Sequence, residues 1–496
     1  MEIGSSEFSR IAATAATLGE AAVDRHRFLD KRVLLTGDPE VLETENGRNC
    51  FLAAAHLVPR ICANVVFAVP RGALLDEARA VAERIAFGQQ IAFVEPGTSD
   101  DSFDAVLSVG TRARPDDRWT LINNDGWLVR LTSDGEHLPR PSGRENPMSA
   151  LAAASLGIAE VFKRLLGLKP SRGGLLRGLS WSLYTYATGS EDIGPPLPCP
   201  LPVDVIMGGV GAIGNGVLYL LGLLPLTGRV IGIDSQTFGS ENLGTCMLIG
   251  PQDVGTPKAT LVERALAGRV AAKGYHEPLN KFASRLGKEV PYAETIIGAL
   301  DNIEARHALQ DLWPAVLLDG AIGPFLCQAS RHPIDGDVAC ARCLFRQPPG
   351  ERAEVIASRA TGLTVERALM PDEVVTQDDV ERAPPEKRQW LAEKVGKPIC
   401  SIVSEATVRE LTDGHQSGFE PSVPFVATLA SSMVVGELIK AALQAEPAIE
   451  PRFQFDVLRG PASGQLLPQG RRRDCYCVKR ARQIAAWRDQ RRNPIP

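Results

Sequence analysis

Strand-length apolar runs alternate with helix-length segments through the first third of the chain. Apolar residues at helical spacing occupy 52–61 and 74–85. The strand-length runs are KRVLLTG (31–37), ANVVFAVP (63–70), QIAFVEP (90–96) and DAVLSVG (104–110). Because strands that alternate with helices form parallel sheets, this order predicts an α/β domain with a Rossmann-like sheet. The segment DPEVLETENGRNC after Gly37 carries no glycine-rich motif, so no phosphate-binding loop is predicted there.

A predicted hairpin and a long helix follow. TLINNDGWLVRLTSDG (120–135) has two apolar runs around Gly126, and 146–167 is rich in helix formers with apolar residues at helical spacing. We expect this helix to pack between the first domain and the next. From 169 to 202, glycines, a strand-like stretch and the run IGPPLPCPLP indicate a linker.

A second strand–helix pattern begins after the linker and carries a glycine motif. The apolar run VDVIMG (203–208) precedes Gly209, Gly211 and Gly214, and an apolar helix follows. Glycine lets backbone N–H groups approach a phosphate, and the helix N-terminus adds partial positive charge. The next apolar run ends at Asp234, where a carboxylate can bind ribose hydroxyls. The pattern predicts a nucleotide site, and taken alone it is typical of an NAD-dependent dehydrogenase.

Polar residues beyond Asp234 favour a triphosphate over a dinucleotide. Asn242 lies in the triplet ENL, and Lys258 ends the segment DVGTPK. An amide and an ammonium group suit the additional negative charge of a triphosphate. The later strand ETIIGAL is followed by Asp301, whose carboxylate can hold Mg²⁺ against phosphate oxygens. The alternative is that Asp301 only caps the next helix, IEARHAL.

Four cysteines form two close pairs. Cys340 and Cys343 lie in CARCLF, and Cys475 and Cys477 flank a tyrosine near the C-terminus. In a chain whose cysteine usage is that of a reduced protein, two such pairs can complete a tetrahedral zinc site. Four sulfur ligands leave no open position, so the predicted Zn²⁺ is structural and clips the C-terminal segment to the second domain. Unliganded or redox-active cysteines are the alternative.

The motifs follow one another in a single order. They are Gly209-x-Gly211-x-x-Gly214, Asp234, ENL at 241–243, DVGTPK at 253–258, Asp301-Asn302 and CARCLF at 340–345. In this order the chain resembles the ThiF-type adenylating superfamily, which includes the ubiquitin-activating enzymes and the activating enzymes of molybdopterin and thiamine biosynthesis. The resemblance is closest over 203–345. It implies an enzyme that uses ATP to adenylate the C-terminal glycine of a ubiquitin-like protein.

The resemblance also implies roles for single residues. Asp234 would bind the ribose of ATP, Asn242 and Lys258 would bind its phosphates, and Asp301 would hold the Mg²⁺.

Two positions depart from the family pattern. Thr245 stands where an arginine is usual, and Gln236 where a second aspartate is common. Loss of the guanidinium should weaken charge stabilisation at the phosphates unless another cation replaces it.

Ubiquitin-activating enzymes join an inactive and an active half in one chain, and the resemblance implies the same pseudodimer here. The N-terminal α/β domain would be the inactive half; an unrelated fused module is the alternative. Arg10, in Phe8-Ser9-Arg10, resembles the catalytic arginine that reaches from one half into the ATP site of the other. A solvated arginine at a helix start is the alternative.

Cys400 is the predicted nucleophile. It follows a charged, proline-bearing stretch at the place where relatives insert a segment with a nucleophilic cysteine. The nearby Lys394 and Lys397 favour the thiolate, which would attack the acyl-adenylate and form a thioester. A buried structural cysteine in the apolar run ICSIV is the alternative. The thioester would pass to a separate conjugating enzyme, as in bacterial ubiquitin-like conjugation operons that are linked to antiphage defence.

The chain is thus predicted to consist of successive parts. They are an inactive Rossmann-like domain (1–168), a linker (169–202), the ATP-binding part of the adenylation domain (203–345), a catalytic-cysteine insert (346–410), the rest of the adenylation domain with the second cysteine pair (411–477) and a basic tail (478–496). The composition of the tail predicts a solvated helix. On the helix VPFVATLASSMVVGELIKAAL, Glu437 and Lys440 are three residues apart, which predicts a pair on its exposed side.

Composition adds limits on partners. A net charge of −5 gives no reason to expect nucleic acid as a partner. No apolar run reaches the roughly 18 residues of a membrane span and no basic-then-apolar leader begins the sequence, so we expect a cytoplasmic protein without membrane contact. Three other functions stay open: adenylation that ends in sulfur transfer for cofactor biosynthesis, a catalytically silent scaffold that binds a ubiquitin-like protein, and the dehydrogenase.

Overall fold

The structure is a computed structural model of the chain. It describes residues 31–97, 102–112, 118–345, 353–368, 370, 373–397, 399, 402, 423–443 and 452–492. The chain forms two compact units: Met1–Phe345 together with Pro421–Pro496, and Arg346–Glu420.

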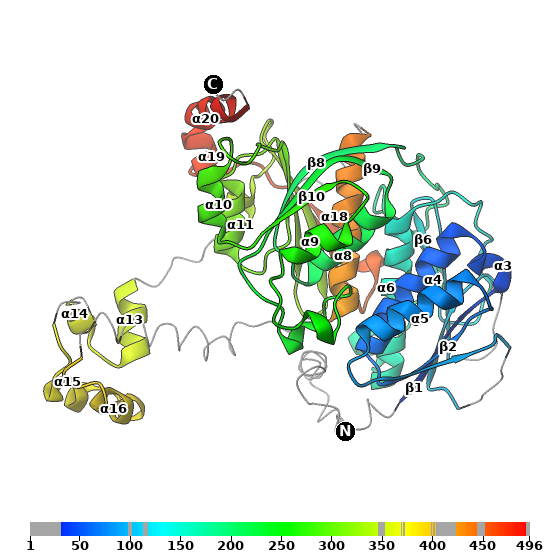
Figure 1. Cartoon of the computed structure of the whole chain (residues 1–496), viewed down its shortest axis with the longest axis horizontal. Helices are drawn as coiled ribbons and strands as arrows, with labels where there is room; N and C mark the ends of the chain where they lie inside the picture. Colours follow the sequence, from blue (N-terminus) through cyan, green and yellow to red (C-terminus); the bar gives the residue numbers. More distant parts are fainter. Residues whose placement is uncertain are drawn as a thin grey trace. The chain divides into compact units, whose positions relative to one another are not determined.

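The first unit contains two sheets, and the N-terminal one has the strand order β3-β2-β1-β4-β5-β6-β7 (Figure 1). Strands β3, β2, β1, β4 and β5 are parallel to one another. Strand β6 pairs antiparallel with β5, and β7 pairs antiparallel with β6. The strands are β1 (Arg32–Gly37), β2 (Asn64–Ala68), β3 (Gln90–Val94), β4 (Ala105–Val109), β5 (Trp119–Asp125), β6 (Leu128–Thr132) and β7 (Leu179–Ser182). The helices are α3 (Pro39–Leu42), α4 (Glu45–Leu57), η1 (Val58–Arg60), α5 (Ala73–Ile85), α6 (Pro147–Leu166) and α7 (Pro170–Gly173). The predicted parallel α/β order is confirmed.

The second sheet has the order β10-β9-β8-β11-β12-β13-β14-β15, parallel as far as β12 and antiparallel beyond it. Its strands are β8 (Leu201–Gly208), β9 (Leu226–Ile233), β10 (Ala271–Tyr275), β11 (Thr295–Gly298), β12 (Val316–Ile322), β13 (Leu326–Pro333), β14 (Arg452–Asp456) and β15 (Gln465–Leu467). Its helices are α8 (Ala212–Leu223), η2 (Ser240–Asn242), η3 (Pro251–Asp253), α9 (Thr260–Ala265), α10 (Leu279–Arg285), α11 (Ile303–Gln310), α12 (Ala341–Leu344), α18 (Pro424–Ala442), η5 (Pro461–Ser463), α19 (Tyr476–Lys479) and α20 (Ala481–Arg492). Edge strand β10 was not predicted, because its sequence AAKGY has little apolar pattern.

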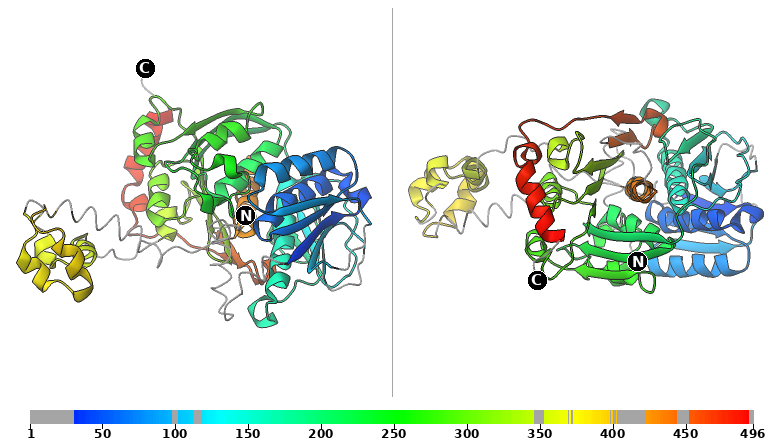
Figure 2. Two further views of the ribbon diagram at one scale, coloured as in Figure 1. Left: turned by 60° about the horizontal axis from the view of Figure 1, so that its bottom comes forward. Right: turned by 90° about the horizontal axis from the view of Figure 1, so that it is seen from above.

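Helices α6 and α18 pack against each other between the two sheets (Figures 1 and 2). Helix α6 also contacts α4 and β5, whereas α18 contacts α8, β12 and β13. The hydroxyls of Ser155 and Thr428 are hydrogen-bonded at 2.8 Å, and the rings of Phe162 and Phe425 lie 5.4 Å apart. The prediction that the 146–167 helix packs between the domains is therefore confirmed. Helix α18 is long and apolar enough to cross a membrane by composition, yet it is buried in this core.

The prediction of an exposed Glu437–Lys440 pair is wrong. Because α18 is enclosed by its neighbours, both side chains are fully buried and form an ion pair there. Glu437 Oε1 also accepts a hydrogen bond from the Tyr186 hydroxyl at 3.0 Å. Lys440 Nζ donates to the carbonyl oxygens of Leu183 and Tyr184 at 3.3 and 3.2 Å. The pair thus connects α18 to the chain that follows β7.

The C-terminal tail, predicted to be a solvated helix, is only partly exposed to solvent, because one side of α20 packs on the second sheet domain. Ile484 is buried, and Arg488 forms an ion pair with Glu294 at 3.1 Å. The guanidinium of Arg491 lies 3.8 Å from the ring centroid of Trp487. Apolar residues three apart on one helix side explain why the helix is not wholly in solvent.

The second unit consists of short helices around a core of its own. They are α13 (Ala353–Thr361), α14 (Val365–Ala368), α15 (Gln377–Arg382) and α16 (Pro385–Ala392). Its buried apolar residues include Leu363, Val380 and Leu391. The hydrogen bond from Arg367 lowers the pKa of Asp379 to about 2.

Candidate functional site

The loop between β8 and α8 carries the three predicted glycines. Gly209 has a φ of 94°, and a Cβ there would lie 2.8 Å from the carbonyl carbon of Ala299. A Cβ on Gly214 would overlap the Gly209 carbonyl, whereas one on Gly211 would meet nothing within 4 Å. Gly209 and Gly214 are therefore required by close packing, and Gly211 leaves the backbone open to a ligand.

Asp234 directly follows β9 and faces this loop. Its Oδ2 accepts a hydrogen bond from the Val210 N–H at 2.8 Å, and its Oδ1 accepts one from the Gln236 N–H at 2.8 Å. These bonds fix the carboxylate at the carboxyl end of β9, beside the glycine loop. Each oxygen has a second lone pair, so the same carboxylate can also accept from sugar hydroxyls.

Lys258 is brought to this edge by a short backbone ladder. The Phe238 N–H donates to Thr256 O, and the Lys258 N–H donates to Gln236 O, both at 2.9 Å. Lys258 Nζ donates to Gln236 Oε1 at 2.7 Å. Gln236 stands where relatives often carry aspartate, so the ammonium of Lys258 is held by a neutral amide. An amide competes less with an anionic ligand for this ammonium than a carboxylate would.

Asn242 and Thr245 lie in one tight turn. Asn242 Oδ1 accepts from the Gly239 N–H at 2.9 Å, and its carbonyl oxygen accepts from the N–H groups of Thr245 and Cys246 at 3.0 and 2.8 Å. Thr245 is fully buried in this turn. An arginine at 245 would not fit without rebuilding the turn, so the departure from the family pattern is part of the local packing.

Asn215, which the sequence analysis missed, ties two parts of the site together. It is fully buried in α8. Its Nδ2 donates to the carbonyl oxygens of Val210 and Gly211 at 3.0 Å, and its Oδ1 accepts from the Leu248 N–H at 3.2 Å. The signal for it was a lone polar residue in the otherwise apolar helix GNGVLYLLGL.

Asp301 is exposed just beyond β11. Helix α11 is capped by Asn302, whose Oδ1 accepts from the Ala305 N–H at 2.7 Å. Asp301 Oδ1 accepts from Asn302 Nδ2 at 3.1 Å. The alternative that Asp301 caps this helix is therefore wrong, and its carboxylate stands at the edge where β8, β9 and β11 end.

A buried ion pair anchors α11 to the sheet. Arg306 Nε donates to Asp319 Oδ2 on β12 at 3.1 Å. Burial raises the pKa of Asp319 to about 6 against the opposing effect of the Arg306 charge. Gly298 on β11 faces this carboxylate and has no room for a side chain. The segment that carries Asp301 is thereby held between two anchored elements.

Two predicted residues, Arg10 and Cys400, lie outside the described residues.

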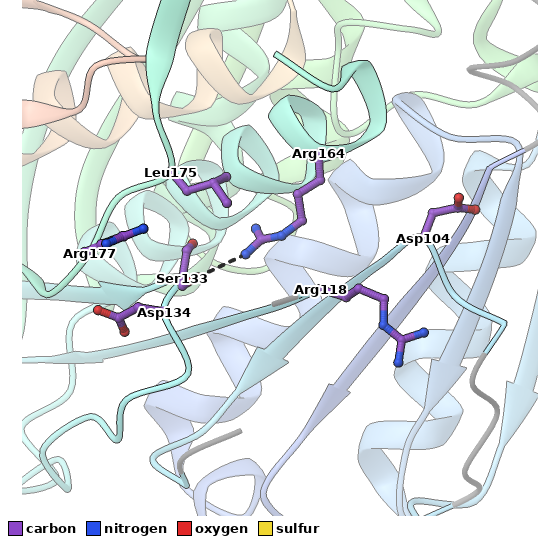
Figure 3. A pocket seen from close by; sticks show the side chains of 7 residues that line it. All are labelled: Asp104, Arg118, Ser133, Asp134, Arg164, Leu175 and Arg177. Atoms are coloured by element: carbon purple, nitrogen blue, oxygen red, sulfur yellow. Dashed lines mark hydrogen bonds between the residues drawn. The ribbon is translucent and has the colours of Figure 1, made fainter. Parts of the chain in front are cut away.

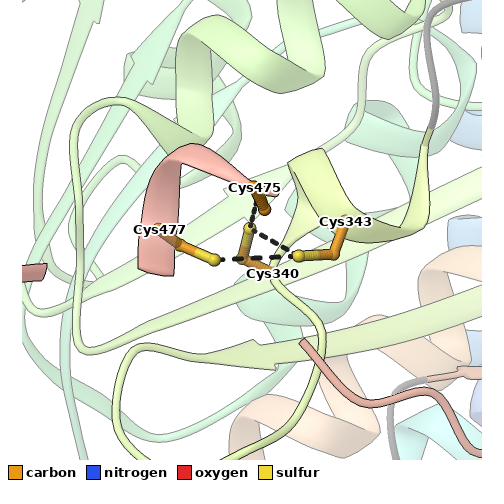
Figure 4. Close-up of side chains that lie close together, drawn as sticks. All are labelled: Cys340, Cys343, Cys475 and Cys477. Carbon is orange, nitrogen blue, oxygen red and sulfur yellow. Dashed lines mark hydrogen bonds between the residues drawn. The ribbon is translucent and has the colours of Figure 1, made fainter. Parts of the chain in front are cut away.

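The four predicted zinc ligands come together (Figure 4). Their Sγ atoms all lie within 4.8 Å of one another and are buried. Cys340 is 3.7 Å from Cys343 and 3.8 Å from Cys475, and Cys343 is 3.7 Å from Cys477. Zn–S bonds of about 2.3 Å in a tetrahedron give sulfur separations of about 3.8 Å, whereas a disulfide needs about 2.0 Å. The donor set therefore fits a structural Zn²⁺ that joins α12 to α19, and the Arg472 N–H donates to Cys343 Sγ at 3.4 Å.

A hollow of about 670 Å³ opens in the N-terminal sheet domain (Figure 3). It is lined by Asp104, Arg118, Ser133, Asp134, Arg164, Leu175 and Arg177. Two of its guanidinium groups already donate to backbone oxygens, Arg164 to Trp119 at 2.9 Å and Arg118 to Phe103 at 3.3 Å. None of the glycine-loop residues lines it, so it is not the nucleotide site.

Fold and site together define a nucleotide-binding α/β protein whose phosphate loop follows the first strand of its second sheet. The profile of the ThiF family matches residues 203–477, more than half of the chain, and the chain belongs to the ThiF family.

Solved structures of one protein are similar in part. E. coli MccB with MccA-N7isoASN has 15% identity and a TM-score of 0.37, with 55% of this chain and 66% of that chain covered. E. coli MccB with AMPCPP and MccA has 14% identity and a TM-score of 0.36 over the same shares. This chain thus spans slightly less than two thirds of the length of MccB. No curated protein matches the chain.

Proposed function

We propose that the chain adenylates the C-terminal glycine of a ubiquitin-like protein and then carries it as a thioester on Cys400. One observation supports the first step above all: the glycine loop follows β8, Asp234 follows β9 and Asp301 follows β11, and these strands are neighbours in the sheet. The carboxyl ends of adjacent parallel strands meet at one edge. A phosphate loop, a ribose carboxylate and a Mg²⁺ carboxylate can thus serve a single ATP molecule.

The proposed chemistry has two steps. A carboxylate oxygen of the glycine attacks the α-phosphorus of ATP, the bond from this phosphorus to the bridging oxygen breaks, and pyrophosphate leaves. Asn242, Lys258 and Arg10 would stabilise the negative charge of the leaving group, and Asp301 would hold the Mg²⁺. The Cys400 thiolate then attacks the acyl carbon and AMP leaves. The resulting thioester would be transferred to a separate conjugating enzyme.

The N-terminal sheet domain is proposed as the inactive half of a pseudodimer. Asp38 follows β1 as Gly209 follows β8, and its Oδ2 accepts from the N–H groups of Thr111 and Arg112 at 2.7 and 3.0 Å. A carboxylate therefore takes the backbone donors that follow β4, and its charge would repel a phosphate. This arrangement supports a half that binds no nucleotide of its own.

The remaining assignments belong to the same proposal. They are the catalytic-cysteine role of the 346–410 insert, a structural Zn²⁺ on the four cysteines, a cytoplasmic location and a part in bacterial antiphage defence.

The test combines pyrophosphate release with gel mobility. The chain is incubated with MgATP and the ubiquitin-like protein encoded nearest to it, and wild type is compared with Asp301→Ala and Cys400→Ala. Cys199→Ala is the matched control, because Cys199 is an exposed cysteine outside the site. We expect a DTT-sensitive adduct in wild type and Cys199→Ala, pyrophosphate without adduct in Cys400→Ala, and neither in Asp301→Ala.

Other outcomes separate the alternatives. An adduct that persists in Cys400→Ala moves the nucleophile to another thiol. Pyrophosphate with a thiocarboxylate or acyl-disulfide product indicates sulfur transfer. Absence of pyrophosphate from wild type refutes activation of this partner and favours the scaffold.

A further inference from the structure

A buried arginine of the N-terminal sheet domain holds the backbone of the nucleotide site. Arg60 ends η1 and is fully buried. Its Nη2 donates to the carbonyl oxygens of Met247 and Ile249 at 2.8 and 2.9 Å, and its Nη1 donates to that of Leu243. The planar fork of one guanidinium thereby fixes three carbonyls of one segment at once.

Neighbouring side chains of the same domain act on the same segment. His56 Nδ1 lies 3.0 Å from the Met247 carbonyl oxygen, and Arg84 Nε donates to that of Leu248 at 3.2 Å. Burial lowers the pKa of Arg60 to about 10, so its guanidinium stays protonated at neutral pH. Its four hydrogen bonds to described residues all reach backbone carbonyl oxygens, the fourth being that of His56 at 3.0 Å.

The segment held by Arg60 leads directly to the nucleotide groups. It begins at Leu243, the residue after Asn242, and its Leu248 N–H donates to Asn215. Asn215 in turn holds the carbonyls of the glycine loop. The N-terminal sheet domain therefore donates hydrogen bonds to carbonyl oxygens of this segment, while Asn215 of α8 accepts one from an N–H group of the same segment. A shift of this segment would move Asn242 and the glycine loop together.

We propose that Arg60 is a positioning residue for ATP, supplied by the half of the molecule that has no phosphate loop. The inference rests on the proposed adenylation. Lysine can replace Arg60 only in part, because a single ammonium cannot reach three carbonyls in a plane. Misplacement of binding groups by about 1 Å costs on the order of a hundredfold in rate, so the effect of losing Arg60 should be large.

The test measures the Kd for MgATP by calorimetry in wild type, Arg60→Met, Arg60→Lys and Thr428→Val. Thr428→Val is the matched control, since it also removes a buried hydrogen bond between the two sheet domains, but one that reaches Ser155 on α6 and not the segment from Leu243 to Ile249. We expect Kd to rise about tenfold or more in Arg60→Met, to recover only in part in Arg60→Lys, and to stay within twofold in Thr428→Val. In pyrophosphate exchange the KM for ATP should rise, whereas the KM for the ubiquitin-like protein should not.

The outcomes distinguish this inference from the function on which it rests. Wild type that binds no MgATP refutes both. Wild type that binds it while both Arg60 variants remain within twofold refutes only the role of Arg60, as does a Thr428→Val variant that weakens binding as much as Arg60→Met. If Arg60→Met does not fold, Arg84→Met tests the same segment from a half-exposed side chain, and an unchanged Kd there overturns the inference.

Discussion

Two glycines of one loop should fail for different reasons when each is replaced by alanine. At Gly209 the φ of 94° is one that L-residues rarely adopt, and a Cβ would lie 2.8 Å from the Ala299 carbonyl carbon. The left-handed conformation costs about 1–2 kcal/mol, and relief of an overlap in a packed core costs about 1–3 kcal/mol. Gly209→Ala should therefore lower the free energy of unfolding by about 2–5 kcal/mol.

Gly211→Ala should leave the fold intact and affect only the ligand. Gly211 has a φ of −75°, and a Cβ there meets nothing within 4 Å, so stability should change by less than about 1 kcal/mol. The same open space is where the backbone would meet a phosphate, so the methyl group should raise the Kd for MgATP about tenfold or more, or about 1.4 kcal/mol.

Urea unfolding followed by circular dichroism and calorimetric titration with MgATP measure the two effects separately. If Gly211→Ala binds MgATP as tightly as wild type, the phosphate does not approach this backbone and the site is wrongly assigned. If Gly209→Ala is as stable as wild type, the steric argument is refuted.

Three further predictions concern buried charge and the cysteine cluster. Burial lowers the pKa of His56 to about 3, so its stabilising effect is present above pH 6.5 and is lost as pH falls, when only the unfolded state takes up the proton. Urea unfolding at pH 7.5 and pH 5 should show that wild type loses about 2 kcal/mol more than His56→Gln, while the exposed-site control His137→Gln behaves like wild type. We expect wild type to hold one Zn²⁺ per chain, as measured by inductively coupled plasma mass spectrometry. Cys475→Ser should lose this zinc and make α20 more sensitive to protease. A Cys475→Ser variant that retains zinc would contradict the four-cysteine site. Lys440→Met should destabilise by about 3–5 kcal/mol, because it removes the nearer of the two cations of buried Glu437 and leaves only Arg331 at 3.8 Å. Adding Glu437→Gln should restore part of this stability; equal loss in both variants would show that charge is not the cause.

The features that the sequence could predict have local patterns. The strand–helix alternation, the glycine loop and the two cysteine pairs each depend on residues a few positions apart, and the folded chain confirms all three arrangements. The beginning of α4 was predicted too late, at Leu52 instead of Glu45. Its N-cap lies in the segment after Gly37, which was searched for a glycine-rich phosphate loop and not for a helix start. There Thr44 accepts a hydrogen bond from the Gly47 N–H and starts the helix.

The features that could not be predicted depend on residues far apart in the chain. Arg60 follows a proline at the end of a helix and resembles a surface residue, but its partners lie more than 180 positions later. The burial of Glu437 and Lys440 follows from α18 being enclosed on every side. Its sequence gave one clue, since a helix that is apolar all around is usually buried, and its few charged residues then need partners inside the core.

We propose that the N-terminal sheet domain binds no nucleotide of its own and instead positions the nucleotide site of the second sheet domain. Asp38 lies in the turn after β1, and its carboxylate accepts hydrogen bonds from the N–H groups of Thr111 and Arg112, which follow β4. The equivalent turn after β8 is open at Gly211. Under the proposed function, Arg60 of the N-terminal sheet domain would hold the backbone next to this open turn, so one sheet would supply the groups that touch ATP and the other would hold them in place.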